Sequence, residues 1–150
     1  MKKTIITISR EFGSGGHFIG EEVAKRMNIP YYDKDIIFQI AEKTGYSESF
    51  IQEQSEYAPS KNLFAYAFVG RDRTGSSLSD QVYAAQTQVI RDLAQKGSCV
   101  IIGRCADYIL KDDPDAYHIF ICGNESEKIA RTQKLFDLSE KEARNMNQDM

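Results

Sequence analysis

Residues 4–16 have the sequence Thr4-Ile5-Ile6-Thr7-Ile8-Ser9-Arg10-Glu11-Phe12-Gly13-Ser14-Gly15-Gly16. The first five are all β-branched and too few for a helix, which predicts a strand buried on both faces, as in a parallel sheet. A glycine-rich turn follows. Apolar residues then recur with helical spacing at Ile19, Val23, Ala24 and Met27. The chain therefore opens as strand, glycine loop and helix.

The rest of the chain continues this alternation. Tyr31-Tyr32 predicts a short second strand, and Asp33 is a candidate N-cap for a helix to about Lys43. Further helices are expected at about 47–57, 78–96, 125–136 and 140–150, and buried strands at 99–102 and 117–122. Such an order is typical of an open α/β sheet with right-handed crossovers.

Two pairs of residues place the last two helices. Asn124 with Glu127, and Ser139 with Glu142, both have the spacing of a capping box. In a capping box the first side chain bonds a free N–H of the first turn, and the acidic side chain bonds back. The helices at about 125 and 140 are therefore expected to begin at these pairs.

Composition limits the class of function. The chain has 150 residues, of which 41% are hydrophobic and 27% charged, and its formal net charge is -3. These values indicate a soluble globular protein and argue against nucleic-acid binding, which needs a basic face. No apolar run approaches the roughly 20 residues of a membrane-spanning helix, and the N-terminus lacks a signal-peptide pattern. We therefore expect a cytoplasmic protein with neither nucleic-acid nor membrane partners.

The cysteines and histidines predict no metal site. Cys99, Cys105 and Cys122 are odd in number and form no CxxC pair, so we expect small buried hydrophobic residues rather than disulfides or ligands. His17 and His118 do not lie at metal-site spacing from any cysteine. A structural zinc is therefore not expected.

The glycine turn is the strongest chemical signal. Glycines between a first strand and a first helix let several N–H groups converge on a phosphate at the helix N-terminus. Against the Walker pattern GxxxxGK[ST], however, Arg10 stands at the first glycine, Gly16 at the lysine and His17 at the hydroxyl. The pattern GxGxxG fits no better, because its third glycine is Phe18. A phosphate site and a plain strand-to-helix turn both stay open.

Three segments carry a family resemblance: Ile6 to Gly16, Pro30-Tyr31-Tyr32-Asp33, and Ile101-Ile102-Gly103-Arg104-Cys105-Ala106-Asp107-Tyr108-Ile109-Leu110. They resemble the cytidylate kinase-like family of P-loop proteins, and the likeness runs over nearly the whole chain. It implies a three-layer α/β/α fold of the P-loop NTPase and nucleoside monophosphate kinase type, with a five-stranded parallel sheet. It also implies a single domain over 1–150, with a monophosphate-binding-type insert at about 46–75 and an end that precedes the family's lid and last strand.

The resemblance also implies a set of site residues. ATP would be bound with Mg²⁺ at the loop residues Gly13, Ser14, Gly15, Gly16, His17 and Phe18. The candidate catalytic residues are Arg10, which would partly replace the lost lysine, Arg104, which would hold the acceptor phosphate, and Arg131. Substrate binding is expected at Asp33, Arg71, Arg73 and Arg104. No protein metal ligand is assigned.

Each assignment has a structural alternative that the sequence leaves open. Arg10 is either a loop cation or the partner of Glu11 in a surface ion pair. Asp33 is either a substrate contact or a helix N-cap. Arg104 has the alternative of a surface salt bridge, and Arg71 and Arg73 that of a solvated, mobile loop. Cys105 stands where true cytidylate kinases carry an aspartate, which puts a preference for cytidine in doubt.

Three functions follow from these observations. The leading hypothesis is ATP-dependent phosphoryl transfer to a nucleoside monophosphate or a similar small phosphorylated acceptor. The second is nucleotide or anion binding without catalysis, because the Walker lysine and hydroxyl are replaced by Gly16 and His17. The third is an assembly module whose unfinished sheet edge is buried by a partner chain, which leaves a homo-oligomer open.

Overall fold

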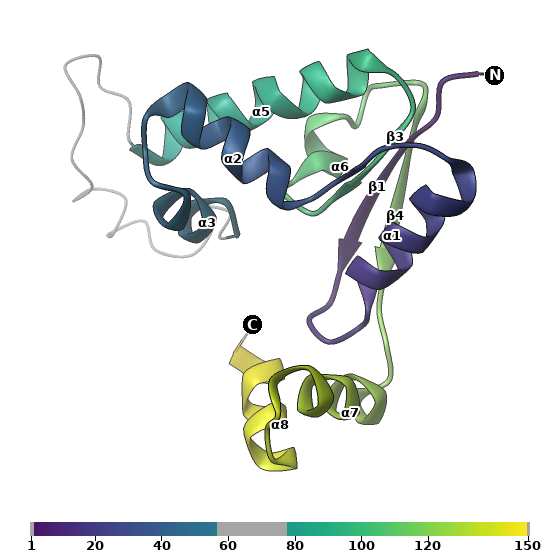
Figure 1. The fold of residues 1–150 in the computed structure, drawn as a ribbon, viewed down its shortest axis with the longest axis vertical. Coiled ribbons are helices and arrows are strands. Elements are labelled where there is room, and N and C mark those ends of the chain that lie inside the picture. The colour runs from purple at the N-terminus through teal and green to yellow at the C-terminus, as the bar shows by residue number, and fades with distance from the viewer. Residues whose placement is uncertain (1, 57–77, 150) are drawn as a thin grey trace.

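The computed structural model describes residues 2–56 and 78–149 (Figure 1). The strands are β1 (Ile5–Arg10), β2 (Tyr31–Tyr32), β3 (Cys99–Ile102) and β4 (Ala116–Ile121). The helices are α1 (Gly16–Met27), α2 (Lys34–Thr44), α3 (Glu48–Glu56), α5 (Leu78–Lys96), α6 (Ala106–Ile109), α7 (Glu125–Phe136) and α8 (Glu140–Asp149). Most of the expected insert, with Arg71 and Arg73, lies outside the described residues.

The strands form one parallel sheet in the order β2-β3-β1-β4. Helix α1 packs on one face, where Ile6 and Ile8 of β1 meet Ala24. Helices α2, α5 and α6 pack on the other face, around Ile5 and Ile101. Neighbouring residues of a strand face opposite sides of its sheet, so a strand with helices on both faces is apolar throughout. The predicted three-layer α/β/α fold is confirmed, and the described residues supply four of the five implied strands.

Helix α1 lies close to the sheet because it presents a glycine there. A Cβ atom at Gly20 would lie 2.5 Å from the Cδ1 atom of Ile102 and 3.2 Å from that of Ile8. Both isoleucines are buried, as is Gly20. The close approach holds the first turn of α1, and with it the glycine loop, near the ends of β1 and β3.

Strand β4 forms where it was predicted, but the expectation that it is buried is wrong. Its central residues are exposed, with Tyr117 at 55% and Phe120 at 64%. The strand is the outermost of the four, and within residues 2–56 and 78–149 the helices pack mainly against β1, β2 and β3 rather than over β4. An apolar run of sequence therefore predicted the strand correctly but not its position at the edge of the sheet.

The expectation that all three cysteines are buried is wrong for the same reason. Cys99 in β3 is buried, whereas Cys105 is half-buried and Cys122, just after β4, is exposed. Cys99 lies between two other strands and under helices, while Cys122 follows the edge strand. All three are free thiols.

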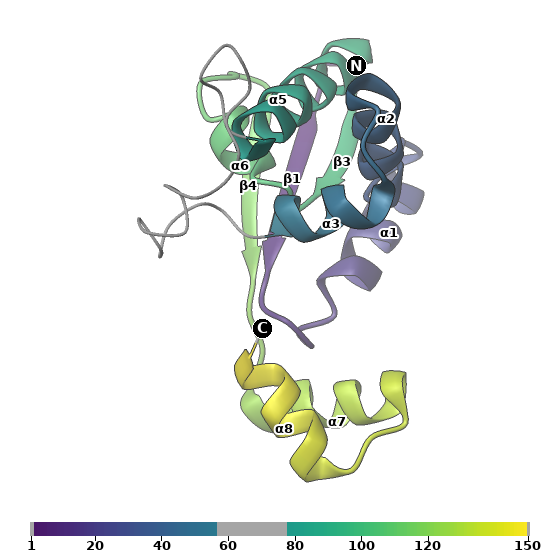
Figure 2. The same cartoon turned by 90° about the vertical axis from the view of Figure 1, so that its left-hand side faces the viewer.

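Helices α7 and α8 lie beyond the carboxyl ends of the strands, apart from the three layers (Figures 1 and 2). The capping box of α8 is confirmed, since the Ser139 amide and hydroxyl bond the Glu142 carboxylate at 2.9 and 2.6 Å. Asn124 is the N-cap of α7, but its side chain makes no capping hydrogen bond. Across the described residues, every helix is too short or too polar to span a bilayer.

Candidate phosphate-binding site

The candidate site lies at the carboxyl ends of β1 and β3. The connection after β1 runs toward β2 at one edge of the sheet, and the connection after β3 runs toward β4 at the opposite edge. Ligands of open α/β sheets bind in the crevice where the connections diverge in this way. By strand order, the corresponding position here, called the crevice below, is the sheet end between the glycine loop after β1 and the turn 103–105 after β3.

The glycine loop has a backbone that side chains would disturb. Gly13 and Gly15 have φ angles of 74° and 83°, in the left-handed region that favours glycine. A Cβ atom at Gly13 would also lie 2.9 Å from the Thr132 hydroxyl oxygen. Gly15 is the N-cap of α1, and the first N–H groups of a helix have no partner inside it. The loop therefore offers backbone donors and the positive end of a helix dipole to an anion.

Arg10 lies along this loop, in the space that a side chain at position 16 would need. A Cβ atom at Gly16 would lie 2.6 Å from the Arg10 Cβ atom and 2.8 Å from its Cγ atom. A Cβ atom at Gly103 would lie 2.7 Å from Arg10 Nη1. Glycine at the Walker lysine position therefore has a physical reason, because the arginine passes through that space and reaches the end of β3.

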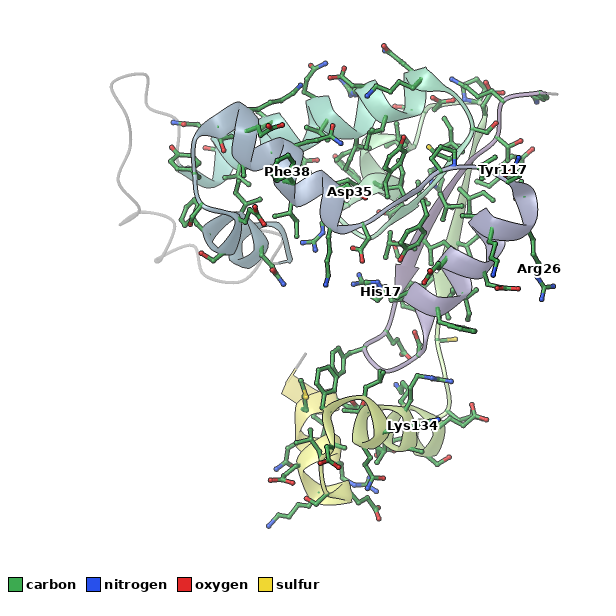
Figure 3. All side chains as sticks on the ribbon, in the orientation of Figure 1. His17, Arg26, Asp35, Phe38, Tyr117 and Lys134 are labelled. Atoms are coloured by element: carbon green, nitrogen blue, oxygen red, sulfur yellow. The ribbon has the colours of Figure 1, made fainter. Side chains whose placement is uncertain are left out.

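His17 connects Arg10 to Asp33. Its Nε2 atom lies 3.0 Å from Arg10 Nη2, and its Nδ1 atom lies 2.8 Å from an Asp33 carboxylate oxygen. Figure 3 shows the His17 side chain at the beginning of α1, on the side that faces the α2 segment. Asp33 is the N-cap of α2, but its side chain makes no capping bond. The carboxylate is instead turned to the candidate site.

The electrostatics of Asp33 and Tyr31 reflect this cluster. Burial raises the pKa of Asp33, but the hydrogen bond from His17, the charge of the His17 ring when it is protonated, and the charges of Arg104 and Arg10 lower it below its usual 3.8. Burial raises the pKa of the neighbouring Tyr31 to about 12, and the charges of Asp33 and Glu21 add to this. Asp33 is therefore ionised and Tyr31 neutral at physiological pH.

Arg104 sits in a strained turn. Gly103, Arg104 and Cys105 have φ angles of 60°, 58° and 54°, and left-handed backbone is costly for residues other than glycine. The side-chain amide of Gln86 on α5 donates a 2.6 Å hydrogen bond to the Arg104 carbonyl oxygen. Both residues are buried. The turn holds the Arg104 charge near Asp33, whose pKa it lowers.

Sequence reasoning missed Gln86. It is buried among Val82, Val89 and Ile90, at helical spacing from each. A polar residue within an apolar stripe was the available signal, because a buried amide needs a hydrogen-bond partner. Its partner, the Arg104 carbonyl, belongs to the candidate site.

Helix α7 contacts the glycine loop on its other side. Arg131 Nη1 donates to the Gly13 carbonyl oxygen at 2.5 Å, and a Cβ atom at Gly15 would lie 3.2 Å from the guanidinium carbon. Lys128 forms a 2.9 Å ion pair with Glu11. Sequence reasoning also missed this pair. It bears on the alternative that Arg10 forms a surface ion pair with Glu11, because Glu11 is paired with Lys128 and Arg10 contacts His17.

The predicted site residues fall into distinct places. Arg10, His17, Asp33 and Arg104 come together at the crevice, and Arg131 lies against the loop from α7. Ser14 is buried, and its hydroxyl finds no hydrogen-bond partner in the described structure. Phe18 is 73% exposed, so most of its side chain is in contact with solvent.

The site fits an anion better than a protein-held metal. Backbone N–H groups and arginines are donors for phosphate oxygens. The ring nitrogen of His17, at the Walker hydroxyl position, is engaged by Asp33. In the described ranges, no three His, Cys, Asp or Glu side chains are grouped as metal ligands. We therefore assign no residue of this chain to Mg²⁺.

The strand order, the glycine loop after β1 and the arginines at the crevice define a P-loop kinase-like fold. The chain belongs to the Cytidylate kinase-like family, whose model matches residues 5–150.

Two solved structures illustrate the likeness. The crystal structure of an uncharacterized protein from Eubacterium ventriosum ATCC 27560 is 32% identical, with a TM-score of 0.70 over 99% of this chain and 74% of that chain. Shikimate kinase from Bacteroides thetaiotaomicron is 16% identical, with a TM-score of 0.54 over 97% of this chain and 75% of that chain. At that identity the likeness concerns the fold alone. No curated protein matches the sequence.

Proposed function

We propose that the protein binds the phosphate groups of ATP at the glycine loop and transfers the terminal phosphoryl group to a nucleoside monophosphate or a similar small acceptor. One observation carries the proposal. Arg10 passes through the space of the Walker lysine side chain and reaches the crevice between β1 and β3. Membership of the Cytidylate kinase-like family supports the same reaction class.

The residues of the crevice would share the work of binding and charge neutralisation. The backbone N–H groups at the start of α1 would hold the phosphate chain, and Arg10 would neutralise its transferred end. The planar guanidinium of Arg104 suits two oxygens of an acceptor phosphate, and the ionised Asp33 suits a hydroxyl or amino donor of the acceptor. Arg131 would approach from α7. In phosphoryl transfer such positioning supplies most of the catalysis.

ATP brings Mg²⁺ with it in this proposal. Mg²⁺ keeps several waters and binds largely through substrate phosphates, so a dedicated protein cage is not required. The ion supplies charge neutralisation on the phosphates when it is bound. Such an enzyme would find its nucleotides in the cytoplasm.

A coupled assay of ADP release across nucleoside monophosphates tests the proposal. We expect ATP-dependent turnover with at least one acceptor, and a loss of about 10²-fold or more in kcat for Arg10→Met and Arg104→Met. Lys25→Met is the matched control, because this exposed cation lies in the last turn of α1, away from the loop. ATP binding without turnover on any acceptor would contradict the kinase proposal.

A second candidate function is nucleotide binding without catalysis. It is favoured by His17, since the position of the Walker hydroxyl is filled by a ring that bonds Asp33. Under this alternative, ATP would raise the melting temperature of the protein. Arg10→Met would lower the affinity for ATP, and no monophosphate would be phosphorylated.

A further inference from the structure

The hydrogen-bonding chemistry of the cluster fixes the tautomer of His17. A guanidinium group only donates hydrogen bonds, so the Nε2 atom facing Arg10 at 3.0 Å must be the acceptor. In a neutral imidazole the proton is then on Nδ1, which donates to the Asp33 carboxylate at 2.8 Å. The direction of donation is therefore Arg10 to His17 to Asp33.

We propose that His17 is a positioning residue that holds the Arg10 guanidinium at the phosphate loop, and that Asp33 holds His17 in the required tautomer. This inference rests on the proposed function, because it explains how an arginine does the work of the missing Walker lysine. It assigns His17 no contact with the reacting atoms.

The position of Arg10 then explains two departures from the Walker pattern, glycine in place of the lysine and histidine in place of the hydroxyl residue. Gly16 leaves the space through which Arg10 passes, and His17 supplies the acceptor that stops its guanidinium there. An imidazole ring carries nitrogens on opposite edges and bridges two partners. A serine or threonine hydroxyl is a single atom close to the backbone and does not span from Asp33 to Arg10.

Arg10 needs such a restraint. An arginine side chain loses much rotamer entropy when it is fixed, and a guanidinium is useful in catalysis only when it is held in place. Gly16 and Gly103 give it room but offer no side chain to bind it. The nearest oppositely charged neighbour in sequence, Glu11, is paired with Lys128. The charge of Asp33 attracts Arg10, and the hydrogen bond to His17 is the directional contact that orients the guanidinium.

His17 can be changed without damage to the core. Its side chain is 52% exposed, so a substitution removes little packing. The hydroxyl of Tyr31 lies 3.5 Å from His17 Nδ1, too long for a strong hydrogen bond, and leaves Asp33 as the main partner of that nitrogen. His17→Leu also removes the hydrogen-bond partner of Asp33, so ATP affinity is compared at a temperature where the variant is fully folded, and a loss there reports on positioning.

The first test measures ATP binding by calorimetry. We expect His17→Leu to weaken ATP about tenfold, and His17→Gln, whose amide also accepts and donates, to keep most of the affinity. Arg10→Met should weaken ATP at least as much, and His17→Leu added to Arg10→Met should have no further effect, because His17 acts through Arg10. Additive losses, or an unchanged affinity in His17→Leu, would overturn the inference. Lys25→Met serves as the control.

The second test needs no ligand. Nitrogen-15 NMR of the free protein should show a proton on His17 Nδ1 and none on Nε2, and Asp33→Asn should shift the ring toward the other tautomer. A proton on Nε2 in the unaltered protein would overturn the inference. A failure of the proposed function can be told apart from a failure of this inference. In that case the unaltered protein would not bind ATP, but the NMR result would still decide whether His17 holds Arg10.

Discussion

Cys99 and Cys122 share an apolar sequence context, yet their thiols have different surroundings. Burial raises the pKa of the Cys99 thiol to about 11, whereas Cys122 is exposed. Because the thiolate is the reactive form, we expect a thiol reagent at pH 8 to modify Cys122 first, half-buried Cys105 more slowly, and Cys99 only after unfolding. Mass spectrometry of timed samples measures the order. Equal labelling of Cys99 and Cys122 in the folded protein would contradict the sheet order.

Asp33 makes a pH-dependent contribution to stability. Its pKa is lower in the folded protein than its usual 3.8, so its ionisation stabilises the fold above that value, and the contribution is lost as the pH falls through the folded pKa. Asp33→Asn should therefore lower the free energy of unfolding at pH 7, by an amount that shrinks below about pH 4. Urea titrations at pH values from 7 down to 2.5 measure the difference. Asp112→Asn, at an exposed turn, is the matched carboxylate-to-amide control.

Helix α1 is the element on which the position of the loop depends. Gly20→Ala would place a methyl group 2.5 Å from Ile102 Cδ1, and extra atoms in a packed interior cost about 1–3 kcal/mol. We expect a loss of that size in the free energy of unfolding, measured in urea, with weaker ATP binding because the loop moves with its helix. Lys25→Ala in the exposed last turn should change neither quantity. A fully stable Gly20→Ala protein would show that α1 does not need this close approach.

Sequence patterns predicted the elements better than the contacts between them. The helices at 78–96 and 125–136 have the predicted bounds, because apolar spacing and capping residues are local signals. The exposure of β4 depends on its place in the sheet, and the path of Arg10 depends on space at Gly16 and Gly103. The ion pair of Lys128 with Glu11 joins residues far apart in the chain. Such features arise only when the fold is assembled.

The two parts of the molecule, the three-layer body and the pair of helices α7 and α8, both contact the glycine loop after β1. The three-layer body holds Arg10, Asp33 and Arg104, while α7 contacts the loop segment through Lys128, which pairs with Glu11, and Arg131, which bonds Gly13. Phe12 of the loop also stacks with Phe136 of α7, with ring centroids 6.1 Å apart. An anion bound at the loop would thus touch residues that fix the position of α7. We therefore expect ligand binding at the loop to affect both the three-layer body and helix α7.

Hydrogen exchange can locate the ligand on the whole molecule. A groove of about 560 Å³ between α7 and α8, lined by Glu125 and Arg144 among others, is a competing location, but Arg144 is already paired with Glu125 and Glu140 there. Saturating ATP should slow amide exchange at the loop 11–18 and the turn 103–105, and raise the melting temperature. Arg10→Met should reduce both effects, whereas Arg144→Met should leave the protection of the loop unchanged. Protection confined to the groove would move the nucleotide away from the crevice and remove the basis for a phosphate site there.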